Sequence, residues 1–170
     1  MPSRFVVRCL SELGTQAPSA KAIDVPCGYG RHSFAAIEHG YKVTAVDVSS
    51  DRVAYVRDVA AGLAVAKRIV AVTRNANDID FATFGPFDLA IVTDFSDLAL
   101  LARLPPGVVS DGHLIFETPA GHGGNWQELP EAGAVRDALC ESFDLVRYIE
   151  RPVGPFAAGR VTVKCLARRR

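Results

Sequence analysis

The chain has 170 residues, of which 49% are hydrophobic and 22% are charged, a composition that predicts one globular domain over residues 1–170. Its 19 Lys and Arg residues balance 19 Asp and Glu residues, which argues against nucleic acid as a partner. No apolar run reaches the roughly 18 residues of a membrane-spanning helix, so no membrane association is expected. The four cysteines form no zinc-binding pattern. We therefore predict no metal centre and a cytoplasmic location.

Short apolar runs rich in β-branched residues alternate with segments of helical periodicity along most of the chain. A helix over residues 3–13 is expected first. The runs predicted as strands are 22–25, 42–46, 69–72, 89–93 and 113–117. Helical spacing follows the first, second, fourth and fifth runs, the last of these over 129–140. The link between the third and fourth runs is short and polar, so its helix is expected to be reduced or missing. This alternation predicts a parallel sheet with right-handed crossovers.

The end of the chain departs from this pattern. Residues 143–150 and 161–167 both have strand character, and only residues 151–160 separate them. That link contains two prolines and two glycines and is too short for a crossover helix. We therefore predict a C-terminal antiparallel hairpin on a single doubly wound, Rossmann-like α/β sheet.

A glycine-containing turn after the first predicted strand carries the clearest functional signal. The segment Asp24-Val25-Pro26-Cys27-Gly28-Tyr29-Gly30-Arg31-His32-Ser33 ends a strand and begins a helix. Gly28 and Gly30 would let a ligand approach the backbone, and the unpaired N–H groups of the new helix would point toward it. The pattern predicts a nucleotide-like ligand at the carboxyl end of the sheet.

Acidic residues follow the next two strands. Asp47 ends the second strand, where a carboxylate can accept hydrogen bonds from both hydroxyls of a ribose. Asp78 and Ile79 follow the third strand, where an acid can accept a bond from an adenine amine and an apolar side chain can contact the ring. Each acid also has a simpler explanation, Asp47 as a helix N-cap and Asp78 as a turn residue. Their order after the glycine turn favours the nucleotide interpretation.

The glycine turn and the end of the second predicted strand resemble the first two motifs of class I S-adenosylmethionine-dependent methyltransferases. Residues 24–32 are similar to the first motif of the small bacterial type that includes the tellurite-resistance methyltransferases, and residues 41–49 match the second motif. Pro26 departs from the pattern, since the family usually has its first glycine there and Pro offers no N–H donor. The resemblance implies seven strands, one of them antiparallel, and S-adenosylmethionine as cofactor.

The resemblance also implies roles for individual residues. Gly28 and Gly30 would lie under the methionine part of the cofactor, and Asp24 would orient the loop and face the amino group. Asp47 would hold the ribose, and Asp78 and Ile79 would bind adenine. Cys27 and Val48, which lie within the two motifs, complete the predicted cofactor-binding set.

A nicotinamide-binding domain shares the glycines and the ribose acid. Its fingerprint requires Gly or Ala where Ser33 stands. A carboxylate at Asp24 also suits an ammonium group and would repel a pyrophosphate. We therefore favour the methyltransferase interpretation.

The acceptor is expected above the carboxyl ends of the fourth and fifth strands. The loop after the fifth strand is rich in glycine and contains His122, our candidate for a catalytic base, which can also be an ordinary solvated loop residue. Asp94 with Glu117 could hold a divalent metal, as in some O-methyltransferases, a less favoured alternative. The pattern of enzymes that methylate base amines is absent after the fourth strand.

We predict methyl transfer to a small molecule by a monomer or homodimer. The alternative is an S-adenosylmethionine-binding module or regulatory subunit without its own transferase activity.

Overall fold

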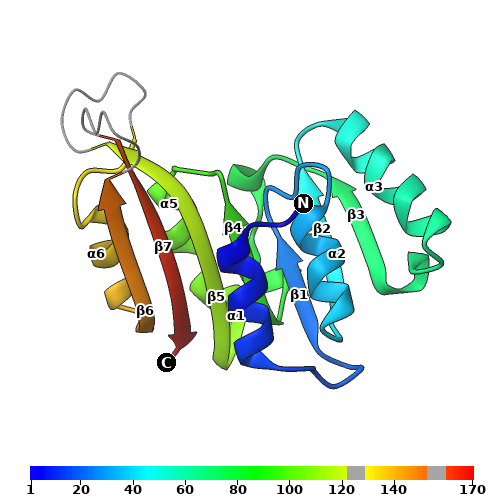
Figure 1. Ribbon diagram of the computed structural model, residues 1–170, viewed down its shortest axis with the longest axis horizontal. Helices are drawn as coiled ribbons and strands as arrows, with labels where there is room; N and C mark the ends of the chain where they lie inside the picture. Colours follow the sequence, from blue (N-terminus) through cyan, green and yellow to red (C-terminus); the bar gives the residue numbers. More distant parts are fainter. Residues whose placement is uncertain (122–128, 153–159) are drawn as a thin grey trace.

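Seven strands form one sheet in the order β3-β2-β1-β4-β5-β7-β6 (Figure 1). The computed structural model describes residues 1–121, 129–152 and 160–170. The strands are β1 (Lys21–Asp24), β2 (Lys42–Asp47), β3 (Ile69–Thr73), β4 (Phe87–Thr93), β5 (Val108–Gly121), β6 (Phe143–Pro152) and β7 (Arg160–Arg169). Strands β1 to β5 are parallel, whereas β7 is antiparallel to both β5 and β6. The predicted fold, including the terminal hairpin, is confirmed.

The fifth strand is longer than predicted. It extends to Gly121 because β7 pairs with it from His113 onward. The helix before β6 is shorter than the predicted 129–140 and begins only at Ala134. The carbonyl of Pro130 accepts a hydrogen bond from the backbone N–H of Gly121 at 3.0 Å, so this segment is tied to the end of β5 before the helix begins.

Helices flank the sheet where the apolar periodicity predicts them. They are α1 (Arg4–Leu13), α2 (Arg31–Glu38), α3 (Ser50–Gly62), α4 (Phe81–Phe84), α5 (Leu98–Arg103) and α6 (Ala134–Cys140), with 3-10 turns η1 (Ala66–Arg68), η2 (Ala76–Asp78) and η3 (Pro105–Gly107). The expected reduction of the link between β3 and β4 is confirmed, since it holds only η2 and the four-residue α4. Ser3 and Ser49 cap α1 and α3 with their side-chain oxygens.

The sheet has an apolar core on each face. One core joins α1, α2 and α3 to strand residues such as Ala22 and Ile115, and the other joins α4, α5 and α6 to residues such as Ile23 and Leu114. Neighbouring strand residues thus enter opposite cores, as expected for strands covered on both sides. No helix within the three described ranges is long and apolar enough to cross a membrane.

The strand order reverses between β1 and β4. The chain moves outward from β1 through β2 to β3, and then returns to β4 on the other side of β1. The loops that leave the carboxyl ends of β1 and β4 therefore diverge toward opposite faces, and a crevice forms between them. The fold positions the glycine turn and the end of β4 at this crevice.

Ile91 tests how strongly the central strands hold the fold. Its side chain is fully buried on β4, and β4 pairs there with Asp24 and Ile115. We expect Ile91→Ala to lower the free energy of unfolding by about 2–5 kcal/mol, through lost burial and the cavity left behind. Val70 on edge strand β3 is 63% exposed, so Val70→Ala is the matched control and should change stability by about 0.5 kcal/mol or less. Urea denaturation measures both changes, and equal effects would contradict this account of the core.

Candidate active site

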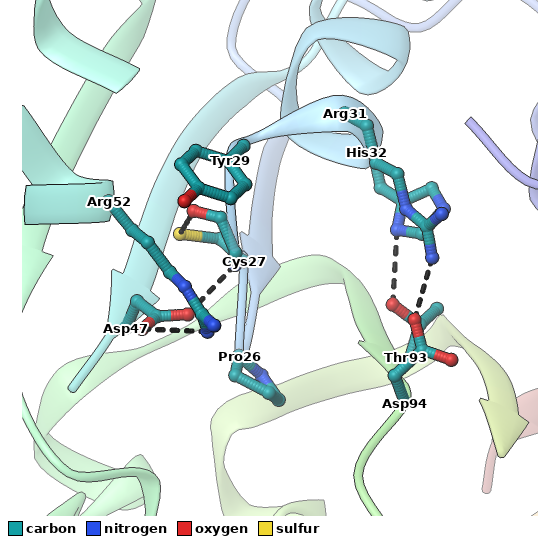
Figure 2. A pocket seen from close by; sticks show the side chains of 10 residues that line it. Pro26, Cys27, Tyr29, Arg31, His32, Asp47, Arg52, Thr93 and Asp94 are labelled. Atoms are coloured by element: carbon teal, nitrogen blue, oxygen red, sulfur yellow. Dashed lines mark hydrogen bonds and ion pairs between the residues drawn. The ribbon is translucent and has the colours of Figure 1, made fainter. Parts of the chain in front are cut away.

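A cavity of about 450 Å³ opens at the crevice between β1 and β4 (Figure 2). Its walls are the turn after β1, the ends of β2 and β4, and the first turns of α2 and α3. The lining residues are Pro26, Cys27, Gly28, Tyr29, Arg31, His32, Asp47, Arg52, Thr93 and Asp94. Three of the predicted cofactor residues, Cys27, Gly28 and Asp47, therefore meet around one cavity.

The two glycines of the turn play different parts. Both have a positive φ, 55° at Gly28 and 77° at Gly30, which favours glycine. A Cβ on Gly28 would meet nothing within 4 Å, whereas a Cβ on Gly30 would lie 2.9 Å from a methyl group of Val56 and 3.1 Å from the Phe34 ring. Gly28 therefore leaves space on the cavity side, and Gly30 lets α2 pack closely against α3.

Asp47 ties the glycine turn to the end of β2. Its carboxylate accepts hydrogen bonds from the backbone N–H groups of Gly28 at 2.8 Å and Ser49 at 3.0 Å. The Arg52 guanidinium lies 3.7 Å away, and the Asp47 side chain is only 1% exposed. Ser49, not Asp47, caps α3, so the simpler explanation for Asp47 as the cap is wrong.

Asp24 lies completely buried at the end of β1, beneath the turn. One of its carboxylate oxygens accepts a 2.6 Å hydrogen bond from the Ser33 hydroxyl, and the other has no hydrogen-bond partner among the described residues. Burial raises the pKa of Asp24 to about 7, although the Ser33 hydrogen bond opposes the shift. A buried carboxyl group with one unused oxygen suits a cationic group of a ligand.

The opposite wall joins the start of α2 to the end of β4. Arg31 and Asp94 form an ion pair of 2.6 Å, and Asp94 has a φ of 54° in the left-handed region. The neighbouring His32 is 1% exposed, and its Nδ1 lies 3.1 Å from the Thr93 hydroxyl. Burial, with a contribution from Arg31, lowers the pKa of His32 to about 4, so its ring is neutral at pH 7.

The structure places other predicted residues outside the cavity wall. Val48 follows β2 with 68% of its surface exposed. Asp78 and Ile79 line a second hollow beside Phe81 and Arg103, and Ile79 is also part of the α4–α6 core. His122 lies outside the described residues.

Several cavity residues were not among the predicted site residues. Arg31 and His32 stand within the first motif, and the two glycines before them could have pointed to both. Tyr29 stands between the two glycines of the same motif. Arg52 carries no sequence signal, because its approach depends on how α3 packs beside the turn, where the guanidinium lies 5.7 Å from the Tyr29 ring centroid. From the sequence, Asp94 is a candidate only as a metal ligand together with Glu117. Each of these carboxylates instead pairs with a cation, Arg31 and Lys164 respectively.

Comparison with known families agrees with this geometry. The methyltransferase-domain family matches residues 22–103, a segment that holds the glycine turn, Asp47 and the end of β4. Over this segment the chain is similar to the methyltransferase-domain family, which supports a class I S-adenosylmethionine-dependent methyltransferase. No curated protein matches its sequence.

Solved structures with this methyltransferase fold cover nearly the whole chain at low identity. TehB from Haemophilus influenzae has a TM-score of 0.81 at 16% identity, covering 99% of this chain and 63% of TehB. Geranyl diphosphate C-methyltransferase from Streptomyces coelicolor A3(2), solved with geranyl diphosphate and S-adenosyl-L-homocysteine, has a TM-score of 0.79 at 14% identity, covering 96% and 78%. The cyclase SpnF has a TM-score of 0.76 at 14% identity, covering 96% and 79%. The fold is therefore shared among proteins that carry different names and activities.

The buried carboxyl of Asp24 predicts a pH dependence of stability. Because its folded pKa is raised above the unfolded value near 4, the native state holds the proton more tightly. This contribution to stability is complete below pH 4 and is lost as the pH rises toward 7, at about 1.4 kcal/mol per pH unit at most. Asp24→Asn keeps the Ser33 hydrogen bond and should remove the dependence. Urea denaturation between pH 5 and 8 measures it. Asp58→Asn, at an exposed position of α3, is the control and should retain the wild-type slope.

Proposed function

We propose that this methyltransferase transfers a methyl group to a small molecule, acting in the cytoplasm as a single domain, either monomeric or homodimeric. The observation that carries the proposal is the cavity at the crevice, where Gly28 and Asp47 lie together. A cytoplasmic location is supported by the four cysteines, all of which are free thiols. Methyl transfer is supported by the methyltransferase-domain family that residues 22–103 match.

The described residues fit S-adenosylmethionine. When bound, this cofactor supplies an electrophilic methyl group on a sulfonium sulfur. Asp47 already accepts two backbone N–H bonds, and its carboxylate has lone pairs left for the ribose hydroxyls. The open space at Gly28 lets the ligand lie against the backbone of the turn. Burial among carboxylates raises the pKa of the Cys27 thiol, so Cys27 stays protonated and serves as an uncharged part of the wall.

The methionine end would lie between Asp24 and Arg31. The unpartnered oxygen of Asp24 would face the amino group, directly or through a water molecule. The Arg31 guanidinium would exchange part of its pairing with Asp94 for the ligand carboxylate, which it can bind with two parallel hydrogen bonds. Val48, Asp78 and Ile79 stay predictions for the adenine end, and His122 stays a prediction as catalytic base.

An alternative function is binding without transfer. The fold relative SpnF is described as a cyclase, so a shared fold does not by itself establish methyl transfer. Incubation with labelled S-adenosylmethionine and candidate acceptors or cell extract separates the two functions. Bound cofactor without transfer of label to any acceptor would favour the binding module or regulatory subunit.

The cofactor class can be tested by thermal unfolding. We expect S-adenosylhomocysteine to raise the melting temperature and NAD and NADP to leave it unchanged, because Asp24 lies where a pyrophosphate would bind. A ligand at 100 times its dissociation constant adds about 2.7 kcal/mol to stability. A shift with NAD alone would support a dinucleotide-binding domain instead.

Asp47 tests the ribose assignment. We expect Asp47→Ala to weaken S-adenosylhomocysteine binding by about 2–4 kcal/mol, because charge-assisted bonds to the hydroxyls are lost. Isothermal titration calorimetry measures the affinity, and circular dichroism checks that the fold survives. The control is Asp58→Ala on the exposed side of α3. Wild-type affinity in the folded Asp47→Ala protein would end the assignment.

A further inference from the structure

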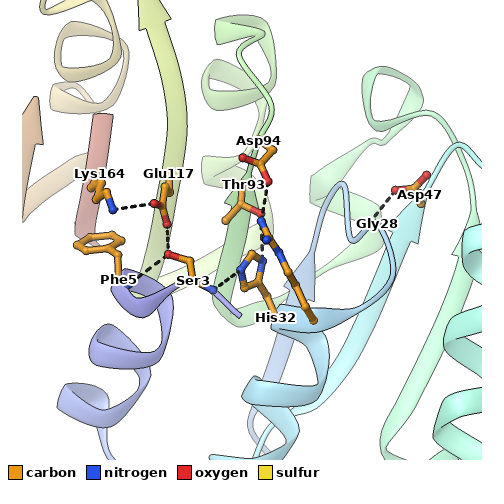
Figure 3. Close-up of polar contacts among 10 residues, drawn as sticks. Ser3, Phe5, Gly28, His32, Asp47, Thr93, Asp94, Glu117 and Lys164 are labelled. Atoms are coloured by element: carbon orange, nitrogen blue, oxygen red, sulfur yellow. Dashed lines mark hydrogen bonds and ion pairs between the residues drawn. The ribbon is translucent and has the colours of Figure 1, made fainter. Parts of the chain in front are cut away.

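The segment before α1 reaches across to the carboxyl end of the central strands. The backbone N–H of Ser3 donates to Nε2 of His32 at 3.2 Å, and the Ser3 hydroxyl donates to the Glu117 carboxylate (Figure 3). Figure 3 shows Ser3 between these two side chains, which come from α2 and β5. His32 is itself part of the cavity wall. Ser3 therefore occupies the position between the cofactor cavity and Glu117.

The two side chains that accept hydrogen bonds from Ser3 are held in place by further contacts. His32 accepts at Nε2, so its neutral ring carries its proton on Nδ1 and donates to the Thr93 hydroxyl. The second carboxylate oxygen of Glu117 lies 2.8 Å from the Lys164 ammonium on β7. The Glu117 side chain is only 16% exposed. Both acceptors are thus oriented and largely screened from water before any ligand arrives, which is the property of a built binding site.

Capping of α1 does not explain this arrangement. As the N-cap, Ser3 uses its hydroxyl oxygen to accept from the N–H of Phe5 at 3.2 Å. This role uses only a lone pair of the hydroxyl oxygen, so it does not account for the partners of the Ser3 hydroxyl proton and backbone N–H. Ser3 nevertheless gives both donors to residues that are distant in the sequence. His32 and Glu117 therefore form a site that accepts two hydrogen bonds. Ser3 donates both of them in this structure.

We propose that His32 and Glu117 form the acceptor-binding subsite, with Thr93 and Lys164 holding their side chains in place. Ser3 occupies the position that the acceptor would take. The subsite has two acceptors facing inward, one neutral and one a carboxylate already neutralised by Lys164. It therefore fits an uncharged molecule with two neighbouring donors, a hydroxyl and a second O–H or N–H. An anion without donors would place its oxygen atoms against two hydrogen-bond acceptors and could satisfy neither of them. This inference rests on the proposed function and names the substrate class for it.

The test follows the amide signal of residue 3 by nuclear magnetic resonance in protein saturated with S-adenosylhomocysteine. The probes are N-acetylethanolamine and catechol as uncharged double donors, and tellurite as a soft anion. We expect the double donors to shift the signal saturably and tellurite to leave it in place. Failure of S-adenosylhomocysteine to bind would count against the proposed function. Normal cofactor binding with no saturable shift for either donor probe would overturn only this inference.

Two variants change the subsite in opposite directions. Glu117→Gln removes the carboxylate and should weaken donor-probe binding tenfold or more. Ser3→Gly removes the competing hydroxyl, and because glycine is a tolerated N-cap it keeps α1. This variant should therefore bind the probes severalfold more tightly.

The control is Glu12→Gln, which loses the 2.8 Å ion pair with Arg147 at a surface away from the subsite and should leave probe binding unchanged. His122→Gln is measured beside these variants. Probe binding that depends on His122 and not on Glu117, or that is equal in the wild type and Ser3→Gly, would overturn the subsite.

Discussion

The hydrogen bond from the Gly28 backbone to the Asp47 carboxylate is the constraint on which the site depends. It joins the turn after β1 to the end of β2 at 2.8 Å and holds Gly28 at a positive φ with open space beside it. The same carboxylate accepts from Ser49 at the start of α3. One buried anion therefore fixes the turn, the strand end and the beginning of a helix, and its charge remains directed at the cavity.

The two halves of the crevice differ in electrostatic character. On the β2 side, Asp47 is buried and satisfied mainly by backbone N–H groups. On the β4 side, Arg31 and Asp94 form an ion pair with both side chains about half exposed or more, so it can be exchanged for contacts with a ligand at little cost. Asp24 lies beneath the turn with an unused oxygen. We infer that the β2 side is preorganised, whereas the methionine side rearranges on binding.

The helices and strands could be predicted from the sequence because hydrophobic residues recur at regular helical or strand spacing along the chain. The hairpin followed from a link too short for a helix, and the cavity residues Cys27, Gly28 and Asp47 followed from motif order at strand ends. The sequence did not show that the two glycines have different roles. Gly30 packs against Val56, and this contact between α2 and α3 is not encoded by any local pattern. Sequence reasoning also placed Asp78 and Ile79 beside Asp47, whereas the described cavity does not include them.

The role of Ser3 shows why the acceptor side was harder to predict than the cofactor side. The predicted cofactor residues stand at or directly after strand ends, so order along the chain points to them. The Ser3–Glu117 contact joins residues 114 positions apart and depends on where α1 lies against the sheet. His32 stands in the first turn of α2, yet its lowered pKa and its bonds to Ser3 and Thr93 arise only when three elements meet. A turn that follows a strand can serve many proteins with this fold, whereas a contact across elements can differ from one protein to the next. In the proposed subsite, acceptor choice therefore depends on packing between elements, and the segment before α1 is part of that packing.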